Sequence, residues 1–403
     1  MTNKSYSIVE SNYRASYGKL FSALINQFGV SSVNEIEDAI QNSFLKSLKS
    51  WKTNQIPDNK ENWLYIVARN DVINQIKKKN KVNSEPVSLK AEESETANGD
   101  LRFQTILFLA SSKNISTQAK VIFILKNIFG LNIREIAEST LLNQDALYKS
   151  INRAKKTLQL EFRDKQINSI LKEVTQNEIS IVEEILYAVF NIGFDSFNEK
   201  IKSIVNEDLC LEALSLTKLL FEKYKLDSTR NLLALFCFHL ARIPAKVSNG
   251  KLISFFEQDK ASWNKELIDL GFYYLKKPEK LDKFHIEALI ASKYMTANSY
   301  TIEHWNDIAK LYEMLMKNFN SPIVTLNYCY CLHKIQRTKE ALELLEQIKN
   351  ELPNGHIYFS LVKANILKET SPKESDKIIS SVLNKMNHTI RKEYLLENGF
   401  INI

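Results

Sequence analysis

The sequence predicts an all-α protein, and three observations carry that prediction. Its 403 residues include only 9 Gly and 7 Pro, too few for the turns of sandwiches and barrels or for glycine-rich nucleotide loops. Apolar residues recur at the three- and four-residue spacing of amphipathic helices. A degenerate repeat of about 34 residues near the C-terminus indicates stacked helical hairpins. The length suits two or three compact units.

Four successive parts differ in composition. The first, residues 6–81, is helical and ends in a basic run, and the second, residues 82–100, is rich in Ser and Glu and lacks hydrophobic periodicity. The third, residues 101–166, is again helical and basic, and the fourth, residues 167–403, is a long helical extension. The loss of periodicity predicts that the second part is a flexible acidic linker. The two helical parts and the extension are therefore expected to fold as separate domains.

The extension contains the repeat. At a shift of 34 residues, Leu332 aligns with Ile366 and Leu345 with Ile379. This period, with two helices per unit, is typical of tetratricopeptide-like (TPR-like) repeats, and an irregular helical bundle is the alternative. Residues 245–253 interrupt the helices with an Asn-Gly pair, which predicts a short β-hairpin with a type I′ turn.

Composition also limits the function. The net charge of +7 permits an acidic partner such as DNA but does not require one. The four cysteines lack C-x-x-C spacing, so we expect buried free thiols in a reducing compartment; they are Cys210, Cys237, Cys329 and Cys331. Residues 1–19 are polar, and the longest apolar stretch, 231–241, is shorter than the roughly 20 residues that a bilayer requires. We therefore expect a cytoplasmic protein without a membrane partner.

The second helical part has the pattern of a helix-turn-helix. Ser116 and Gly130 are placed to cap the two ends of one helix. Asn132 and Glu135 have capping-box spacing at the start of a short helix, and Asn143 is placed to cap the next one. A short helix, a tight turn and a second helix with a basic outer face are the elements of this DNA-binding motif.

The last helix of the motif carries the candidate DNA contacts. Its buried stripe is expected at Leu147, Ile151, Ala154 and Leu158. Residues near its start are placed to reach base edges, and later cations to neutralise phosphates. We expect base contacts from Gln144, Asp145, Tyr148, Lys149 and Asn152, and phosphate contacts from Arg153, Lys155 and Lys156. A solvated basic helix face is the alternative interpretation of the charge alone.

The first helical part has a helix with two stripes. Ser32 and Glu35 have capping-box spacing at its start. The apolar stripe that we expect in the core is Ile36, Ile40, Phe44, Leu48 and Trp51. A second, mixed stripe of Asp38, Gln41, Asn42 and Leu45 suits a partner. The basic helix 61–80 follows a polar loop at 52–60, a combination that fits the handling of single-stranded DNA.

These motifs resemble a known family. Four segments are similar to conserved regions 2 and 4 of extracytoplasmic-function sigma factors: 35–44 (EIEDAIQNSF), 63–70 (WLYIVARN), 133–137 (IREIA) and 150–155 (SINRAK). Further segments resemble the C-terminal extension of the subgroup that carries a tetratricopeptide-like domain: 191–194 (NIGF), 241–246 (ARIPAK), 257–259 (EQD) with Trp263, and 321–327 (SPIVTLN). The resemblance implies core RNA polymerase and promoter DNA as partners in transcription initiation.

The resemblance also implies residue roles. It assigns binding of the polymerase β′ clamp helices, or support for it, to Asp38, Gln41, Asn42, Phe44 and Leu45, although Asn42 stands where the family usually has an acid. It assigns the melted −10 element to Lys52, Asn54, Asn59, Lys60, Arg69, Asn74, Lys77 and Lys78. The helix around 145–156 is implied to read the −35 element while region 4 rests on the β flap.

Catalytic chemistry is not indicated. The six histidines are scattered, and no H-E-x-x-H, G-x-S-x-G or phosphate-loop motif occurs, so we expect no enzyme activity, metal or cofactor. His239, Glu257 and Asp259 are expected to be buried charge rather than a site. The alternative function is a helix-turn-helix regulator or adaptor whose TPR-like domain binds a peptide or protein, without sigma activity. We expect the extension to act in cis as a regulatory or stabilising module that contacts the two sigma regions, and no segment identifies an anti-sigma partner.

Overall fold

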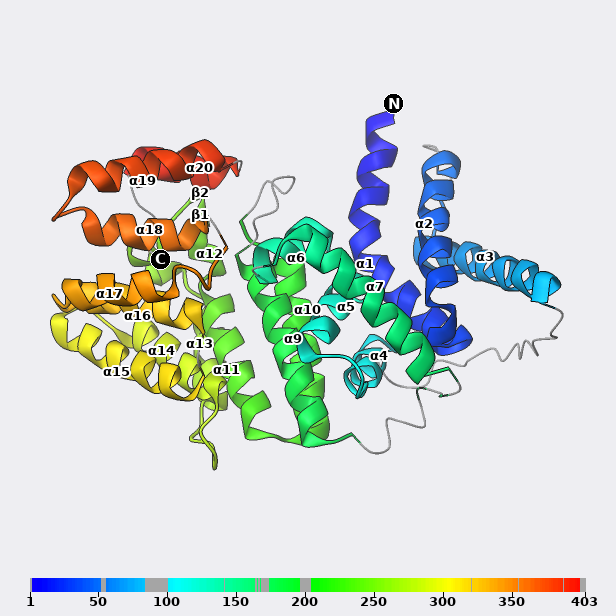
Figure 1. Cartoon of the computed structure of the whole chain (residues 1–403), viewed down its shortest axis with the longest axis horizontal. Coiled ribbons are helices and arrows are strands. Elements are labelled where there is room, and N and C mark those ends of the chain that lie inside the picture. The colour runs from blue at the N-terminus through cyan, green and yellow to red at the C-terminus, as the bar shows by residue number, and fades with distance from the viewer. Residues whose placement is uncertain are drawn as a thin grey trace. The chain divides into compact units, whose positions relative to one another are not determined.

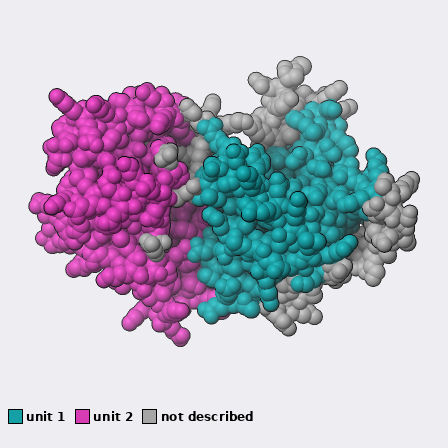
Figure 2. Space-filling view, viewed as in Figure 1, with its two compact units in different colours: residues 1–185 teal, residues 186–403 magenta. Residues whose placement is uncertain are grey.

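The predicted all-α fold is confirmed. The computed structural model describes residues 2–51, 56–83, 101–140, 142–163, 165, 167, 174–195, 204–319, 321–353, 355–386 and 388–398. Within these residues the chain is helical except for one two-stranded hairpin (Figure 1). It forms two compact units, residues 1–185 and 186–403, which Figure 2 colours separately. The boundary falls inside helix α9 (Gln176–Phe194).

Unit 1 contains the two helical parts that precede the extension. Its helices before α9 are α1 (Thr2–Phe28), η1 (Val30–Ser32), α2 (Val33–Ser50), α3 (Lys60–Asn83), α4 (Leu101–Ala110), α5 (Thr117–Asn127), α6 (Ile133–Thr140) and α7 (Gln144–Glu161). Helix α1 packs against both α2 and α4, and its Phe21 ring meets Phe123 of α5 edge-on at 6.3 Å. Trp51 and Trp63 close the contact between α2 and α3, with ring centroids 5.5 Å apart. The two helical parts thus share one core.

Local capping predictions in unit 1 are mostly confirmed. Ser116 and Asn143 accept hydrogen bonds from the backbone of Ala119 and Ala146, at 3.3 and 2.8 Å. Gly130 has a φ of 62°, the left-handed conformation that ends α5 without steric cost. In the capping box of α6, the backbone N–H of Glu135 donates to Asn132 Oδ1 and that of Asn132 to Glu135 Oε2, both at 2.9 Å.

One predicted box is wrong. Ser32 does precede α2, but its side chain makes no capping bond. Its hydroxyl donates instead to the carbonyl of Phe28 at 3.3 Å, because the 3-10 turn η1 points it back toward α1. Glu35 is drawn away to Lys79 on α3, with Oε1 and Nζ 2.8 Å apart.

Unit 2 is built from successive helices and a small insertion. After α9 they are α10 (Glu207–Tyr224), α11 (Asp227–Ala241), α12 (Ile243–Lys246), β1 (Val247–Ser248), β2 (Lys251–Leu252), η2 (Phe255–Glu257), η3 (Lys260–Ser262), α13 (Lys265–Tyr274), α14 (Lys283–Thr296), α15 (Ile302–Asn318), α16 (Pro322–Lys334), α17 (Thr338–Ile348), α18 (Ile357–Leu367), α19 (Pro372–Lys385) and α20 (Thr389–Asn398). All four cysteines are buried and unpaired. None of the described helices is long and apolar enough to cross a membrane.

The C-terminal helices pair as hairpins. Helix α16 packs against α17 and α18 against α19 (Figure 1). The second helices of these pairs begin at Thr338 and Pro372, which keeps the predicted period. Leu332 and Ile366, aligned in the sequence, are both fully buried at equivalent places in α16 and α18.

The predicted β-hairpin is also present. Val247 pairs with Leu252 and Ser248 with Lys251 in an antiparallel register. Asn249 and Gly250 have φ angles of 50° and 77°, as a type I′ turn requires. The hairpin lies between α12 and η2, and β2 packs against α20.

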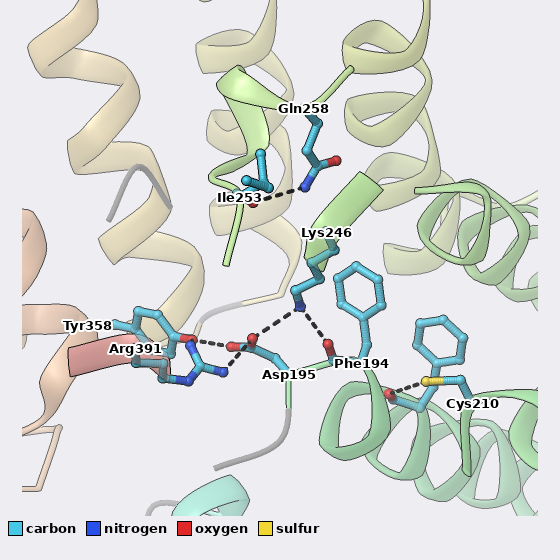
Figure 3. Close-up of polar contacts among 9 residues, drawn as sticks. Phe194, Asp195, Cys210, Lys246, Ile253, Gln258, Tyr358 and Arg391 are labelled. Atoms are coloured by element: carbon cyan, nitrogen blue, oxygen red, sulfur yellow. Dashed lines mark hydrogen bonds and ion pairs between the residues drawn. The ribbon is translucent and has the colours of Figure 1, made fainter. Parts of the chain in front are cut away.

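A cluster of charged side chains, called here the Asp195 clasp, joins the first and last helices of unit 2 (Figure 3). Asp195 follows α9, and its Oδ1 accepts from Lys246 Nζ at 3.1 Å and from Arg391 Nη2 at 2.7 Å. Tyr358 of α18 donates its hydroxyl to Asp195 Oδ2 and accepts from Arg391 Nη1 at 3.1 Å. The Lys246 ammonium also donates to the carbonyl of Phe194 at 2.5 Å.

The clasp is electrostatically strong because its cations are buried. Arg391 of α20 is 2% exposed and Lys246 of α12 is 7% exposed. Burial alone would raise the pKa of Asp195, but the nearby Arg391 and Lys246 charges and the Tyr358 hydrogen bond hold that pKa well below its ordinary value. Burial lowers the pKa of Lys246 to about 8 despite the attraction of Asp195. Asp195 therefore compensates two buried cations at once.

We expect Asp195→Asn to destabilise unit 2 by about 2–4 kcal/mol, because it leaves Lys246 and Arg391 buried without an anion. Urea unfolding followed by circular dichroism measures this change. Asp269→Asn is the matched control, since Asp269 is exposed on α13, and we expect it to stay within about 0.5 kcal/mol of the parent. Equal stability of the two variants would contradict the clasp.

Candidate nucleic-acid interface

Helices α6 and α7 follow each other in the chain and pack together at the place where the sequence predicts a helix-turn-helix. Leu147, Ile151, Ala154 and Leu158 of α7 are buried, as expected from their spacing. The opposite face of α7 is exposed and carries seven of the eight predicted −35 residues: Gln144, Asp145, Tyr148, Lys149, Asn152, Arg153 and Lys156. Tyr148 is 54% exposed, a high value for an aromatic side chain. This face can present hydrogen-bonding groups and cations to a nucleic acid.

Lys155, the eighth residue, is placed differently. Its Nζ lies 2.5 Å from Glu37 Oε2 of α2, and both side chains are only 16% exposed. The side chain amide of Gln159 adds a hydrogen bond to the carbonyl of Ser31 at 3.2 Å. In this conformation Lys155 therefore holds α7 to α2 and η1 instead of facing outward with Arg153 and Lys156.

A second ion pair joins the two helical parts of unit 1. Arg14 Nη2 of α1 lies 2.6 Å from Glu135 Oε1 of α6. Glu135 is 5% exposed, and the same carboxylate accepts from the backbone N–H of Asn132. Burial lowers the pKa of nearby Lys126, against the opposing attraction of Glu37 and Glu135. The contact between the parts is thus a set of partly buried charges around Glu37 and Glu135.

The predicted partner-binding stripe lies on α2. Asp38, Gln41, Asn42 and Leu45 are exposed, and Leu45 is 56% exposed. Asn42 donates its side-chain amide to Asp71 of α3 at 2.8 Å. Phe44 is buried against Tyr13, with ring centroids 4.7 Å apart. It can therefore support this surface from below but cannot touch a partner directly.

The predicted −10 residues lie around α3. Lys52 and Asn54 fall outside the described residues. Asn59 accepts from the backbone N–H of Asn62 at 2.9 Å and so caps the helix. Asn59, Asn74, Lys77 and Lys78 are exposed, whereas Lys60 and Arg69 are half-buried. Helix α3 therefore presents two exposed cations, Lys77 and Lys78, near its C-terminal end.

Sequence reasoning missed Glu37, Arg14 and Glu135 as residues that hold the two parts together. Glu37 stands directly before Asp38 in the partner-binding helix, and its pattern gives no sign of a partner 118 residues away. Glu135 was expected only as a capping residue. The sequence signal that could have identified Glu37 is its position: it is an acidic residue one place outside the regular exposed stripe that begins at Asp38.

The expectation of buried charge at His239, Glu257 and Asp259 is wrong, because Glu257 and Asp259 are exposed. Asp259 caps η3 by accepting from the backbone N–H of Ala261 at 2.9 Å. Glu257 accepts from the Tyr394 hydroxyl at 2.9 Å. Burial lowers the pKa of His239 to about 3, with Arg242 and Lys246 adding to the effect. Within the described residues, no group of three His, Cys, Asp or Glu side chains is placed to hold a metal ion.

Comparison with known proteins gives partial matches. Residues 9–82 match the model of Sigma-70 region 2, which covers α1 to α3. Residues 178–278 match a family of unknown function, DUF6596. An uncharacterized protein of Rhizobium meliloti (strain 1021) is 25% identical over 349 residues, covering 83% of this chain and 81% of its own length. No solved structure matches the chain.

The N-terminal match supports a sigma-70 family factor with a role in transcription initiation. It implies core RNA polymerase and promoter DNA as partners. The match to DUF6596 includes Asp195 and Lys246 of the clasp but ends before Tyr358 and Arg391. It assigns no activity to unit 2.

We expect the Glu37–Lys155 pair to contribute about 1–2 kcal/mol to the stability of unit 1, because both partners are mostly withdrawn from water. A double-mutant cycle with Glu37→Gln and Lys155→Met measures this coupling in chemical denaturation. The Lys79–Glu35 pair is the control, since Lys79 is largely exposed. Its coupling should stay below about 0.5 kcal/mol, and equal couplings would contradict the assignment.

Proposed function

We propose that this protein is an extracytoplasmic-function type sigma factor that binds core RNA polymerase and directs promoter recognition. The observation that carries the proposal is the Sigma-70 region 2 match over residues 9–82, and the exposed basic face of α7, which packs against α6, supports it. Helices α1 to α3 would bind the polymerase and the melted strand, and helices α6 and α7 would bind duplex DNA. Both belong to unit 1.

The surface proposed to bind the polymerase β′ clamp helices is the exposed stripe of α2. Asp38, Gln41 and Leu45 follow the spacing of one helix face, and all three are exposed. An exposed leucine among polar side chains is typical of the centre of a small protein interface. Phe44, buried beneath, fixes the orientation of this face by packing on Tyr13.

The surface proposed to read the −35 element is the outer face of α7. Gln144, Tyr148 and Asn152 lie at four-residue intervals on this face, starting from the helix N-terminus, which is the end that helix-turn-helix proteins insert in the major groove. Arg153 and Lys156 lie further along and are suited to phosphates. We place Lys155 in this set only when its pair with Glu37 opens.

The −10 surface is proposed for α3 and the loop before it. Lys77 and Lys78 are exposed cations near the end of the helix, suited to the phosphates of a melted strand. Unit 2 is proposed to act in cis as a regulatory or stabilising TPR-like module. Its stacked hairpins α16–α17 and α18–α19 support that role.

Reconstitution with core polymerase tests the polymerase-binding surface. We expect Leu45→Asp to reduce core-enzyme affinity at least about tenfold, because a charge replaces the apolar centre of the stripe. Affinity is measured by fluorescence anisotropy with labelled protein, and promoter-directed transcription is measured in parallel. Leu396→Asp, at a comparably exposed leucine of α20, should leave both unchanged. If the parent protein neither binds core enzyme nor directs transcription, the sigma function is excluded and a DNA-binding adaptor remains.

Two substitutions on α7 should have different effects on DNA binding. Asn152→Ala should relax sequence preference at one position of the −35 element by about 1–3 kcal/mol, because a base contact is lost. Lys156→Met should weaken binding to all sequences alike and lower the salt slope by about 1, since one phosphate contact is lost. Binding of promoter fragments by the holoenzyme at several salt concentrations separates the two. Identical effects would contradict the division between base and phosphate contacts.

A further inference from the structure

Unit 2 contains a polar cavity that none of the surfaces described above uses. Its volume is about 310 Å³, within the range of small-molecule sites. It lies where three helices end: Lys334 closes α16, Asn365 stands in the last turn of α18, and Asn398 closes α20. The end of η2 contributes Glu257. The walls are therefore built from four segments far apart in the sequence.

The cavity holds two ammonium groups. Lys334 is half-buried, and its Nζ sits 5.1 Å from the centre of the Tyr330 ring. Burial lowers the pKa of Lys334, and the attraction of Glu369 only partly opposes this. Within the part of the chain that the structure describes, Lys334 forms no ion pair. Lys368, just past the end of α18, is the second ammonium.

The cavity also holds two carboxylates. Glu257 is exposed and accepts a hydrogen bond from Tyr394 at 2.9 Å, which fixes its orientation without neutralising its charge. Glu369 is exposed next to Lys368. Among the described residues, neither carboxylate forms an ion pair within the cavity. The C-terminal ends of α16, α18 and α20 add partial negative charge, which favours a cationic group.

This mixture of charges limits the chemical classes of ligand that the cavity can bind. A nucleotide or polyphosphate would be repelled by Glu257 and Glu369. A lipid or aromatic ligand would find no apolar wall, because the lining side chains are charged, amide, imidazole or phenol. A neutral sugar would offer no charged group to Lys334, Glu257 or Glu369. A small molecule that carries one carboxylate and one ammonium matches both signs at once.

We propose that this cavity binds a small zwitterion of the amino-acid class. Lys334 and Lys368 would receive its carboxylate, and Glu257 and Glu369 its ammonium. Asn365 and Asn398 also line the cavity, and the amide nitrogen of Asn398 already donates to the carbonyl of Tyr394 at 3.1 Å. The proposal concerns binding by the protein alone, so its failure and that of the sigma function are distinguishable.

Binding would add to the existing contacts among these helices, which include the packing of α16 against α18 and the hydrogen bond from Arg391 of α20 to Tyr358 of α18. The ligand would bridge α16, α18 and α20 at their C-terminal ends. Helix α20 also carries Arg391 of the Asp195 clasp, one turn before Tyr394 of the cavity. A ligand that ties α20 to α16 and α18 would therefore stabilise the C-terminal hairpins, because it binds only the folded state.

Thermal unfolding of the full chain provides the first test. The protein is heated with each common L-amino acid at millimolar concentration, and with the matching carboxylic acid and amine that lack one charge. We expect one or a few amino acids to raise the melting temperature by a few degrees and the single-charge analogues to have no effect. If no amino acid raises it, or if an analogue does so equally, the zwitterion proposal is overturned.

Titration calorimetry with the active amino acid then locates the site. Lys334→Met and Glu369→Gln should each weaken binding at least about tenfold, because each removes one charge partner. Lys377→Met and Glu374→Gln alter exposed residues of α19 outside the cavity and should bind like the parent. Circular dichroism of each variant confirms that it is folded. Unchanged binding by both cavity variants would place the ligand elsewhere and refute the assignment.

Discussion

The Asp195 carboxylate is the interaction on which the form of unit 2 depends. It compensates Lys246 and Arg391, two buried cations from helices far apart in the sequence, and accepts a hydrogen bond from the Tyr358 hydroxyl as well. Burying such cations without an anion costs several kcal/mol. The helices that carry them, α12 and α20, are therefore tied to the end of α9. Because α20 also supplies part of the polar cavity, the clasp fixes one wall of that cavity.

Unit 1 uses charge in a similar way but places it at the contact between two helical parts. Glu135 caps α6 and binds Arg14 of α1, and Glu37 binds Lys155 of α7. The Glu37–Lys155 pair holds α7 against α2, and the outer face of α7 stays exposed. The proposed polymerase stripe of α2 lies beside Glu37 in the sequence. Polymerase binding at that stripe and opening of the Glu37–Lys155 pair would therefore involve adjacent residues of α2, Asp38 and Glu37.

Much of the candidate interface was predictable because it depends on local spacing. The cap at Asn143, the buried stripe of α7 and its exposed opposite face follow from helix periodicity alone. Periodicity also predicted the exposure of Leu45 and the burial of Phe44. The absence of a capping bond at Ser32 was not predictable, because the preceding 3-10 turn redirects its hydroxyl to Phe28. A pattern cannot show how the chain enters the helix.

The sequence by itself determined the all-α class, the helix ends marked by Gly130 and Asn132, and the β-hairpin at Asn249 and Gly250, since each depends on a few adjacent residues. Only the tertiary structure decided which charges meet. Lys155 finds Glu37 across 118 residues, and Arg391 finds Asp195 across 196. An exposed cation and a paired one have the same local sequence pattern. What separates them is which helix packs alongside, and that is set by the burial of all the apolar stripes together.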